Sequence, residues 1–232
     1  MNSSSLQTAA ALTATARELH KPRSFDETLD VVVRSTLQAL PVFDHVGVSI
    51  AHRDGRVETL AGTDRFVWEL DELQHRVGDG PGAHVIRQDP VVLVEHLRHD
   101  QRWPHYVTHA VGAGLRAQMC LRLYTEEDTL GALNLYSTSS ETIDSESVQL
   151  AELFASHAAT ALARARREHD LQQALASRKV IGQALGILSE RYRLDQERAF
   201  DFLARTSSTR NIKLRVLADE IVQDTNARYA AA

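Results

Sequence analysis

A helical apolar pattern begins at Ser145 and continues toward the C-terminus without a proline, which restricts the possible folds of this chain. Within it, residues spaced three and four apart form two successive stripes along the helix, which we call seams. The second seam is out of phase with the first by about one residue. The first seam consists largely of small residues: Val148, Ala151, Ala155, Ala158, Leu162 and Ala165. The second comprises Leu171, Ala174, Arg178, Ile181, Leu185, Leu188 and Tyr192. This regularity favours a long helix that pairs in a coiled-coil dimer, although the Ala-rich first half also fits a helix lying on its own sheet.

The slip between the seams falls in the polar stretch 166–170, where we place the junction between two modules. We expect a first domain at 1–163, a helical coiled-coil linker at 164–177 and a C-terminal domain at 178–232. Residues 1–163 hold 13 Lys and Arg against 22 Asp and Glu, whereas residues 164–232 hold 13 against 9. The basic module is the candidate for binding phosphate backbones, with an ordinary solvated helical face as the alternative.

Composition narrows the class of protein. A hydrophobic content of 43% and a charged content of 25% indicate a globular protein rather than a disordered one. The single cysteine, Cys120, excludes an intrachain disulfide and suits a reducing compartment. No run approaches the roughly 18 apolar residues that cross a bilayer, and the N-terminus lacks the pattern of a signal peptide. We therefore expect a cytoplasmic protein with no membrane partner.

The first domain alternates between helical and strand patterns. Ser24 and Glu27 form a capping box that begins a helix reaching Leu40, after an initial helix expected over Leu6–Leu19. The apolar period then changes to two, and Asp54-Gly55 separates two strands of a hairpin. We expect strands at 45–52, 56–62, 90–94, 116–124 and 129–136, helices at 64–75 and 83–87, and a helix and loop at 97–114. This order predicts an α+β fold, an antiparallel sheet sandwiched with helices.

The C-terminal module is expected to be a small three-helix bundle. Asp195 is a favourable N-cap for its second helix, which we expect to end in a loop at Ser207–Asn211. A further apolar stripe follows from Leu214 to Val222, so the basic residues remain on the outside.

This module resembles the ANTAR domain, an RNA-binding module of bacterial transcription antitermination regulators. The residues that carry the resemblance span all three helices: Arg178, Ile181, Ala184, Gly186, Leu188, Ala199, Phe200, Leu203, Leu214, Val216 to Ala218, Ile221 and Val222. Two positions depart from the family pattern. Leu185 stands where the family usually has a lysine before the glycine, which removes one phosphate contact, and Ser189 stands where it usually has methionine.

The first domain is similar to the GAF domain, a fold that senses small molecules. The resemblance is carried by Gly78–Gly82 before a helix, by Trp103-Pro104 and by Leu130–Tyr136 on a late strand. It implies a sensor, with room for a small-molecule ligand of unknown identity, coupled to an RNA-binding output.

RNA recognition commonly targets hairpin loops, whose bases stack on aromatic rings or guanidinium planes. Arginine supplies both such stacking and forked contacts to phosphate. Tyr192 is a candidate stacking platform. The candidate RNA-binding residues are Arg178, Lys179, Arg191, Tyr192, Arg193, Arg198, Arg210, Lys213 and Arg215. A homodimer would present two such surfaces to RNA stem-loops, and the resemblance implies recognition of paired hairpins so that a terminator cannot form.

Two alternatives remain open. The last two helices fit a DNA-binding helix-turn-helix regulator, with Arg210, Lys213 and Arg215 reaching a major groove. Alternatively, the chain is a ligand-binding GAF dimer without a nucleic-acid output. No catalytic constellation stands out, so we do not expect an enzyme. Neither a resident cofactor nor a metal is expected: His105 and His109 have helical spacing for a metal but lack a third ligand.

Overall fold

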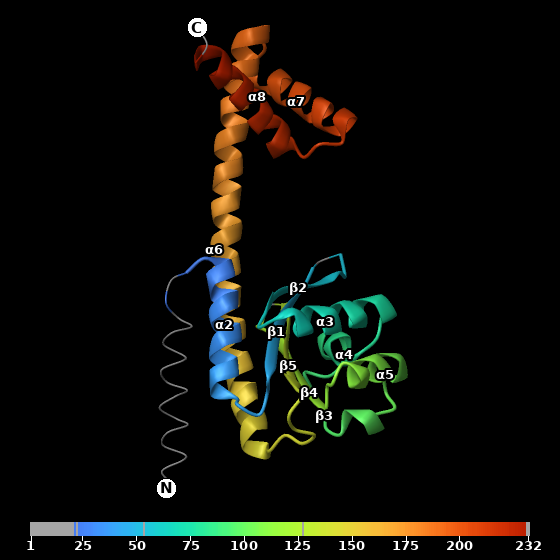
Figure 1. Cartoon of the computed structure of the whole chain (residues 1–232). Helices are drawn as coiled ribbons and strands as arrows, with labels where there is room; N and C mark the ends of the chain where they lie inside the picture. Colours follow the sequence, from blue (N-terminus) through green and yellow to red (C-terminus); the bar gives the residue numbers. More distant parts are fainter. Residues whose placement is uncertain (1–20, 22, 53, 127, 231–232) are drawn as a thin grey trace. The chain divides into compact units, whose positions relative to one another are not determined.

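The computed structural model describes residues 21, 23–52, 54–126 and 128–230 (Figure 1). The chain divides between Arg166 and Arg167 into two compact units, which we call the N-terminal unit and the C-terminal unit. The helix expected over Leu6–Leu19 lies outside the described residues.

The N-terminal unit contains a five-stranded antiparallel sheet with the strand order β2-β1-β5-β4-β3. Its strands are β1 (His45–Ala51), β2 (Val57–Gly62), β3 (Val91–Val94), β4 (Ala117–Tyr124) and β5 (Thr129–Ser137). The predicted hairpin is confirmed, since β1 pairs with β2 and Gly55 adopts a φ of +84° in the turn between them. Each strand begins and ends within one residue of its predicted range.

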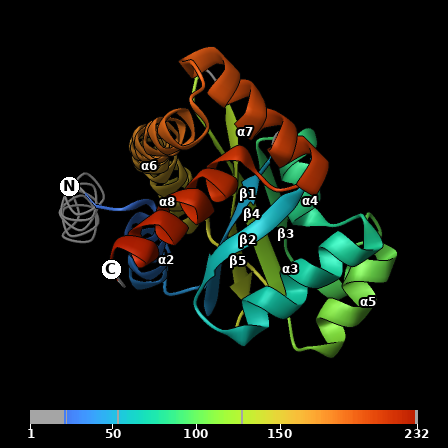
Figure 2. The same ribbon diagram turned by 90° about the horizontal axis from the view of Figure 1, so that it is seen from above.

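Helices cover both faces of this sheet (Figures 1 and 2). Helix α2 (Phe25–Ala39) and the first part of α6 (Ser145–Tyr192) pack on one face, where Leu29, Leu133 and Ala155 share a core. The other face carries α3 (Arg65–Val77), α4 (Pro81–Arg87), the short 3-10 helix η1 (Leu97–His99) and α5 (Pro104–Gly112). The predicted α+β sandwich is confirmed.

Local capping signals decide where two of these helices begin. At α2 the Ser24 side chain accepts a hydrogen bond from the Glu27 N–H, and the Glu27 carboxylate accepts one from the Ser24 N–H, which confirms the capping box. Helix α4 begins at Pro81 rather than at the predicted Ala83. Proline has no N–H to leave unsatisfied in a first turn, so it starts this helix instead of ending the turn before it.

Gly131 allows the two central strands to approach closely. It lies on β5 opposite Ile50 of β1. A Cβ atom at this position would lie 1.9 Å from the backbone oxygen of Ser49. The pairing of β5 with β1 therefore requires a residue without a Cβ atom at position 131.

Helix α6 is one uninterrupted helix of 48 residues, so the slip between its two seams does not break it. In its first half the small seam residues are buried against the sheet, for example Ala151, Ala155 and Ala158. In the second half Leu171 and Leu175 are 61% and 57% exposed. The sheet therefore accounts for the first seam. In the second seam Ile181, Leu185 and Leu188 pack in the apolar core of the C-terminal unit, whereas Leu171 and the neighbouring Leu175 leave apolar surface exposed.

The C-terminal unit continues α6 into α7 (Gln196–Arg210) and α8 (Leu214–Ala230). The predicted loop at Ser207–Asn211 is wrong for most of its length, because α7 runs through Arg210. The Ser and Thr side chains there remain on helical backbone. Asn211 ends the helix by adopting a left-handed conformation with φ of +51°.

Cys120 is buried, as expected of a small core residue, and the Gln118 Nε2 donates to its sulfur. Burial raises the pKa of this thiol. His109 Nδ1 lies 2.9 Å from the backbone oxygen of His105, and the described residues contain no group of three His, Cys, Asp or Glu that could hold a metal ion. Within the same residues, no helix has the length and apolar character to cross a membrane.

Asp44 makes the stability of the N-terminal unit depend on pH. Partial burial raises the pKa of its carboxyl, but the N–H and hydroxyl groups of Thr138 and Ser139 donate to Oδ2 and hold that pKa below its usual value. The stabilisation is present above the unfolded pKa and is lost as pH falls through the folded pKa.

We therefore expect Asp44→Asn to lower the free energy of unfolding by about 1–3 kcal/mol at pH 7. The difference from the parent protein should shrink as pH falls below about 4. Urea unfolding over a pH series measures both. Asp30→Asn, at an exposed position on α2, serves as the control. A difference that stays constant down to pH 2 would contradict the assignment.

Candidate nucleic-acid interface

The basic residues of the C-terminal unit surround a small apolar core. The buried members come from all three helices: Ala184, Leu188, Ala199, Leu203, Leu217 and Ala218. Because these positions recur on one face of each helix, the cations between them face solvent. All nine candidate RNA-binding residues are exposed.

The turn between α6 and α7 gathers four of the nine. Arg193 adopts a left-handed conformation with φ of +53°, and the Leu194 N–H donates to the Ser189 carbonyl at 3.1 Å, which ends α6. Asp195 then caps α7 by accepting from the Arg198 N–H, as predicted. The residues at or beside this turn are Arg191, Tyr192, Arg193 and Arg198.

The turn between α7 and α8 gathers three more. Asn211 ends α7, and the Ser207 hydroxyl donates to the Ile212 carbonyl. The 15 residues of α7 separate this turn from the previous one by about 22 Å along the helix. Arg178 and Lys179 lie elsewhere, on α6. The nine residues therefore occupy three places rather than one patch: the first turn, α6 itself, and the second turn with Arg210, Lys213 and Arg215.

Ion pairs distinguish the cations from one another. Arg198 lies 3.6 Å from Asp195, Arg210 lies 3.0 Å from Glu220, and Arg191 donates to the Thr225 hydroxyl at 3.2 Å. The remaining five form no ion pair with any described residue and are free to bind an anion: Arg178, Lys179, Arg193, Lys213 and Arg215.

Exposed aromatic rings accompany the cations at the first turn. Tyr192 is 53% exposed, and its ring centroid lies 5.6 Å from that of Phe202 at a tilt of 37°. Phe202 is itself 43% exposed. Sequence reasoning proposed Tyr192 as a stacking platform but missed Phe202, whose exposure depends on how α7 packs. The pair presents aromatic surface of the kind on which nucleobases stack.

A groove of about 760 Å³ lies between α6 and α8. Gly182 and Gly186, one turn apart, open its α6 side, and a Cβ atom at either position would meet nothing within 4 Å. Sequence reasoning also missed this groove, for which the glycine pair was the available signal. Its polar lining residues are Gln183, Glu190, Arg191, Thr225, Asn226 and Arg228.

The structure shows the surroundings of Leu185, which stands where ANTAR domains usually carry a lysine. This side chain is half-buried and packs against the apolar core of the C-terminal unit. A hydrophobic residue is therefore well accommodated at this position in the core, and the positive charge at this end of α6 comes from other positions.

Comparison with protein families matches a GAF domain to residues 22–163 and an ANTAR domain to residues 169–222. The chain belongs to the GAF family and carries an ANTAR domain C-terminal to its GAF domain. The GAF match covers the sheet and its helices, and the ANTAR match covers the apolar core of the three-helix bundle. Both resemblances noted in the sequence are thereby confirmed. These domains are regulatory rather than catalytic.

Solved structures share the GAF fold at low sequence identity. The GAF domain of a phosphoenolpyruvate-protein phosphotransferase from Coxiella burnetii is 17% identical with a TM-score of 0.56, covering 71% of this chain and 98% of that one. Its Acinetobacter counterpart is 13% identical with a TM-score of 0.55, covering 72% and 97%.

A bacteriophytochrome from R. palustris is also 13% identical with a TM-score of 0.55, over 79% of this chain. This chain spans 42% of that protein's length. These likenesses concern the fold alone. No curated protein matches the chain.

Proposed function

We propose that this GAF–ANTAR protein is a transcription antitermination regulator that binds hairpin RNA through its ANTAR domain under control of its GAF domain. In this proposal residues 1–163 form the sensor, 164–177 a coiled-coil linker and 178–232 the RNA-binding domain. The protein acts on nascent transcripts in the cytoplasm, and it shifts an equilibrium between RNA structures without catalysis.

The observation that carries the proposal is a set of five exposed cations, on a domain matched to ANTAR, that form no ion pair with the residues that the structure describes. A cation that already pairs with a carboxylate must break that pair to bind phosphate, whereas these five need not. The aromatic pair Tyr192 and Phe202 adds a stacking surface beside Arg193. Cations for the backbone together with rings for unpaired bases are what recognition of a hairpin loop requires.

A homodimer fits the same proposal. Leu171 and Leu175 leave apolar surface exposed on α6, next to the RNA-binding domain. Pairing of this stretch with a second copy would bury that surface and place two RNA-binding domains on one particle. The second hairpin would then bind nearly intramolecularly, which raises avidity without new contacts.

One titration separates this function from the alternatives. The full-length protein is titrated with a tandem-hairpin RNA, with the same RNA carrying mutated loops, and with duplex DNA, each over a salt series. We expect binding that depends on the loops and weakens with salt. Preference for duplex DNA would favour a helix-turn-helix regulator, and binding no tighter than background would favour a sensor dimer without nucleic-acid output.

Single cation variants should weaken RNA binding without unfolding the domain. Arg178→Ala and Lys213→Ala each remove an exposed charge that pairs with no carboxylate in the described part of the chain, so we expect about fivefold to tenfold weaker binding and a shallower salt dependence. Arg205→Ala is the matched control, since Arg205 is 83% exposed on α7 but lies 4.0 Å from Asp201. Unchanged affinity in both variants, or an equal loss in the control, would count against this surface.

A further inference from the structure

A cavity of about 230 Å³ lies in the GAF domain between the sheet and helices α3 and α4. Its floor is polar and comes from three elements: Ser49 on β1, Asp71 and Gln74 on α3, and Asn134 on β5. Arg56, His75 and Arg87 stand among its lining residues. The volume is below the 300–1,000 Å³ typical of sites for drug-sized ligands, so it suits a smaller molecule.

Most of the floor is already satisfied by internal hydrogen bonds. Asp71 is buried, and its carboxylate accepts from the hydroxyls of Thr59, Ser49 and Tyr136. Burial raises the pKa of this carboxyl, against the lowering effect of the Thr59 and Tyr136 hydroxyls. The Asn134 Nδ2 donates to the Ser49 hydroxyl at 3.0 Å. These bonds fix the orientation of the Asn134 amide.

Among the described residues, one buried polar atom of the cavity floor lacks a hydrogen-bond partner. Asn134 is 2% exposed, and its Oδ1 accepts no hydrogen bond from any described residue. Buried acceptors in native proteins are almost always paired, so an orphan in a cavity wall indicates a missing donor. A Cβ atom at Gly82 would lie 3.2 Å from this oxygen, so the glycine keeps the space beside it open.

The cations around the cavity are not equivalent. Arg56 already pairs with Asp54 at 3.3 Å and with Glu58 at 3.7 Å. Arg87 is exposed and has no ion pair or hydrogen bond with a described residue. Arg87 is therefore the guanidinium that is free to pair with a bound anion.

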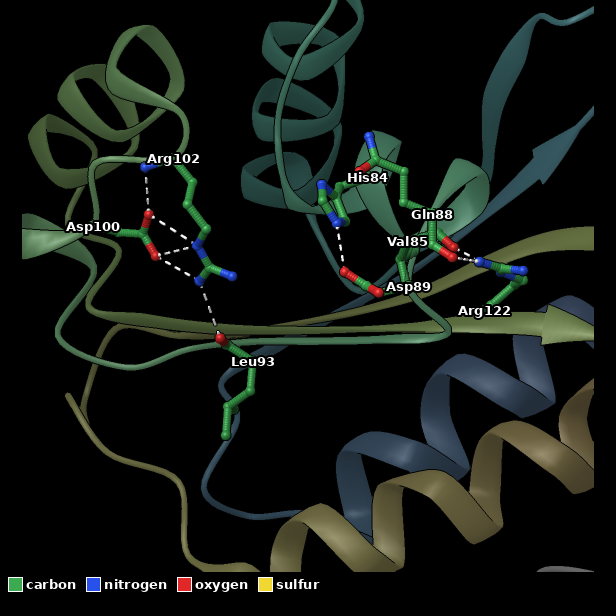
Figure 3. A network of polar contacts seen from close by, with 8 residues as sticks. All are labelled: His84, Val85, Gln88, Asp89, Leu93, Asp100, Arg102 and Arg122. Carbon is green, nitrogen blue, oxygen red and sulfur yellow. Dashed lines mark hydrogen bonds and ion pairs between the residues drawn. The ribbon is translucent and has the colours of Figure 1, made fainter.

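Helix α4, which carries Arg87, is bonded to the sheet through Arg122, whose hydrogen bonds to Val85 and Gln88 are drawn in Figure 3. From β4, the Arg122 Nε donates to the Val85 carbonyl at 2.7 Å and its Nη2 donates to the Gln88 carbonyl at 2.5 Å. His84 Nε2 lies 2.8 Å from Asp89 at the end of the same helix. The two Arg122 hydrogen bonds tie α4, which also carries Gly82 and Arg87, to β4.

We propose that this cavity binds a small organic monocarboxylate, of the size of an amino acid or hydroxy acid, which donates an N–H or O–H to Asn134 Oδ1 and pairs its carboxylate with Arg87. A planar carboxylate matches the fork of one guanidinium. A single unpaired arginine, with Asp54 and Glu58 close by on the hairpin, suits one negative charge better than a phosphate dianion. The inference deepens the sensor role in the proposed function.

The test uses full-length protein with the L-amino acids and a set of 2-hydroxy acids as probes, followed by thermal shift and calorimetric titration. We expect at least one probe to bind with a Kd below about 1 mM. Arg87→Gln should weaken that binding about tenfold or more, whereas Arg34→Gln, an exposed arginine on the opposite face of the sheet, should leave it unchanged. Gly82→Ala should also weaken it, since the added Cβ faces Asn134 Oδ1 and Gln74 Oε1.

Three outcomes would overturn the proposal: no probe binds up to about 10 mM, cyclic nucleotides bind where the carboxylates do not, or Arg87→Gln leaves the affinity unchanged while its melting temperature shows a folded protein. RNA binding is measured separately on the same preparation. If no ligand binds but hairpin RNA does, the result counts only against the cavity assignment. If a ligand binds but hairpin RNA does not, the result counts only against the RNA-binding role.

Discussion

Gly131→Ala is expected to prevent the sheet of the GAF domain from forming its native pairing. The added Cβ atom would lie 1.9 Å from the Ser49 carbonyl oxygen, and this neighbour is backbone that cannot rotate away. The strands β1 and β5 would have to separate at the centre of the sheet, between both apolar cores. We expect the free energy of unfolding to fall by about 4 kcal/mol or more, beyond the usual cost of overpacking.

Both tryptophans of the chain, Trp68 and Trp103, lie in the GAF domain, so tryptophan fluorescence during urea unfolding reports on this domain. Gly112→Ala is the matched control, because a Cβ atom at that position on α5 meets nothing within 4 Å. The control should unfold at the parental urea concentration or slightly above it. Equal midpoints for the two variants would refute the steric argument.

The double variant Leu171→Asp/Leu175→Asp is expected to convert the proposed dimer into a monomer. Burying one leucine side chain stabilises an interface by about 1.5–3 kcal/mol, and the dimer would bury four. Placing four carboxylates there instead should weaken self-association by at least about a thousandfold. Sedimentation equilibrium over a concentration series measures this directly.

Affinity for a tandem-hairpin RNA should fall to that for a single hairpin in the same double variant, because the second RNA-binding domain is lost from the particle. Gln172→Asp adds a charge at an exposed neighbouring position that carries no apolar side chain, and it should leave the dimer intact. A monomeric parent protein, or a double variant that still dimerises, would contradict the coiled-coil assignment.

Local signals were sufficient to predict most of the GAF fold. The capping box at Ser24 and the turn at Asp54-Gly55 act within a few residues, so the sequence determines them without reference to the rest of the molecule. The prediction of a loop after Thr206 was wrong because the conformation there depends on tertiary packing rather than on local signals. Ser and Thr only weakly disfavour helix, and the packing of α7 keeps them helical until Asn211.

The candidate sites were less predictable. Residue type and clustering along the chain identified the cations. The ion pair of Arg198 with Asp195 is local, three residues apart, but the ion pair of Arg210 with Glu220 joins two helices and depends on how they pack. The contact between Tyr192 and Phe202 has the same origin. Nothing local marks Asn134, whose unpartnered oxygen becomes apparent only when β5 and α4 are placed together.

The burial of Cys120 also has a practical consequence. Its sulfur is inaccessible and its raised pKa keeps it as the unreactive thiol, so maleimide reagents should leave the native chain unmodified. A cysteine introduced on the surface of the ANTAR domain would then be the single labelling position. Fluorophores attached there would let the separation between two copies on one RNA be followed by energy transfer, in an otherwise unaltered background.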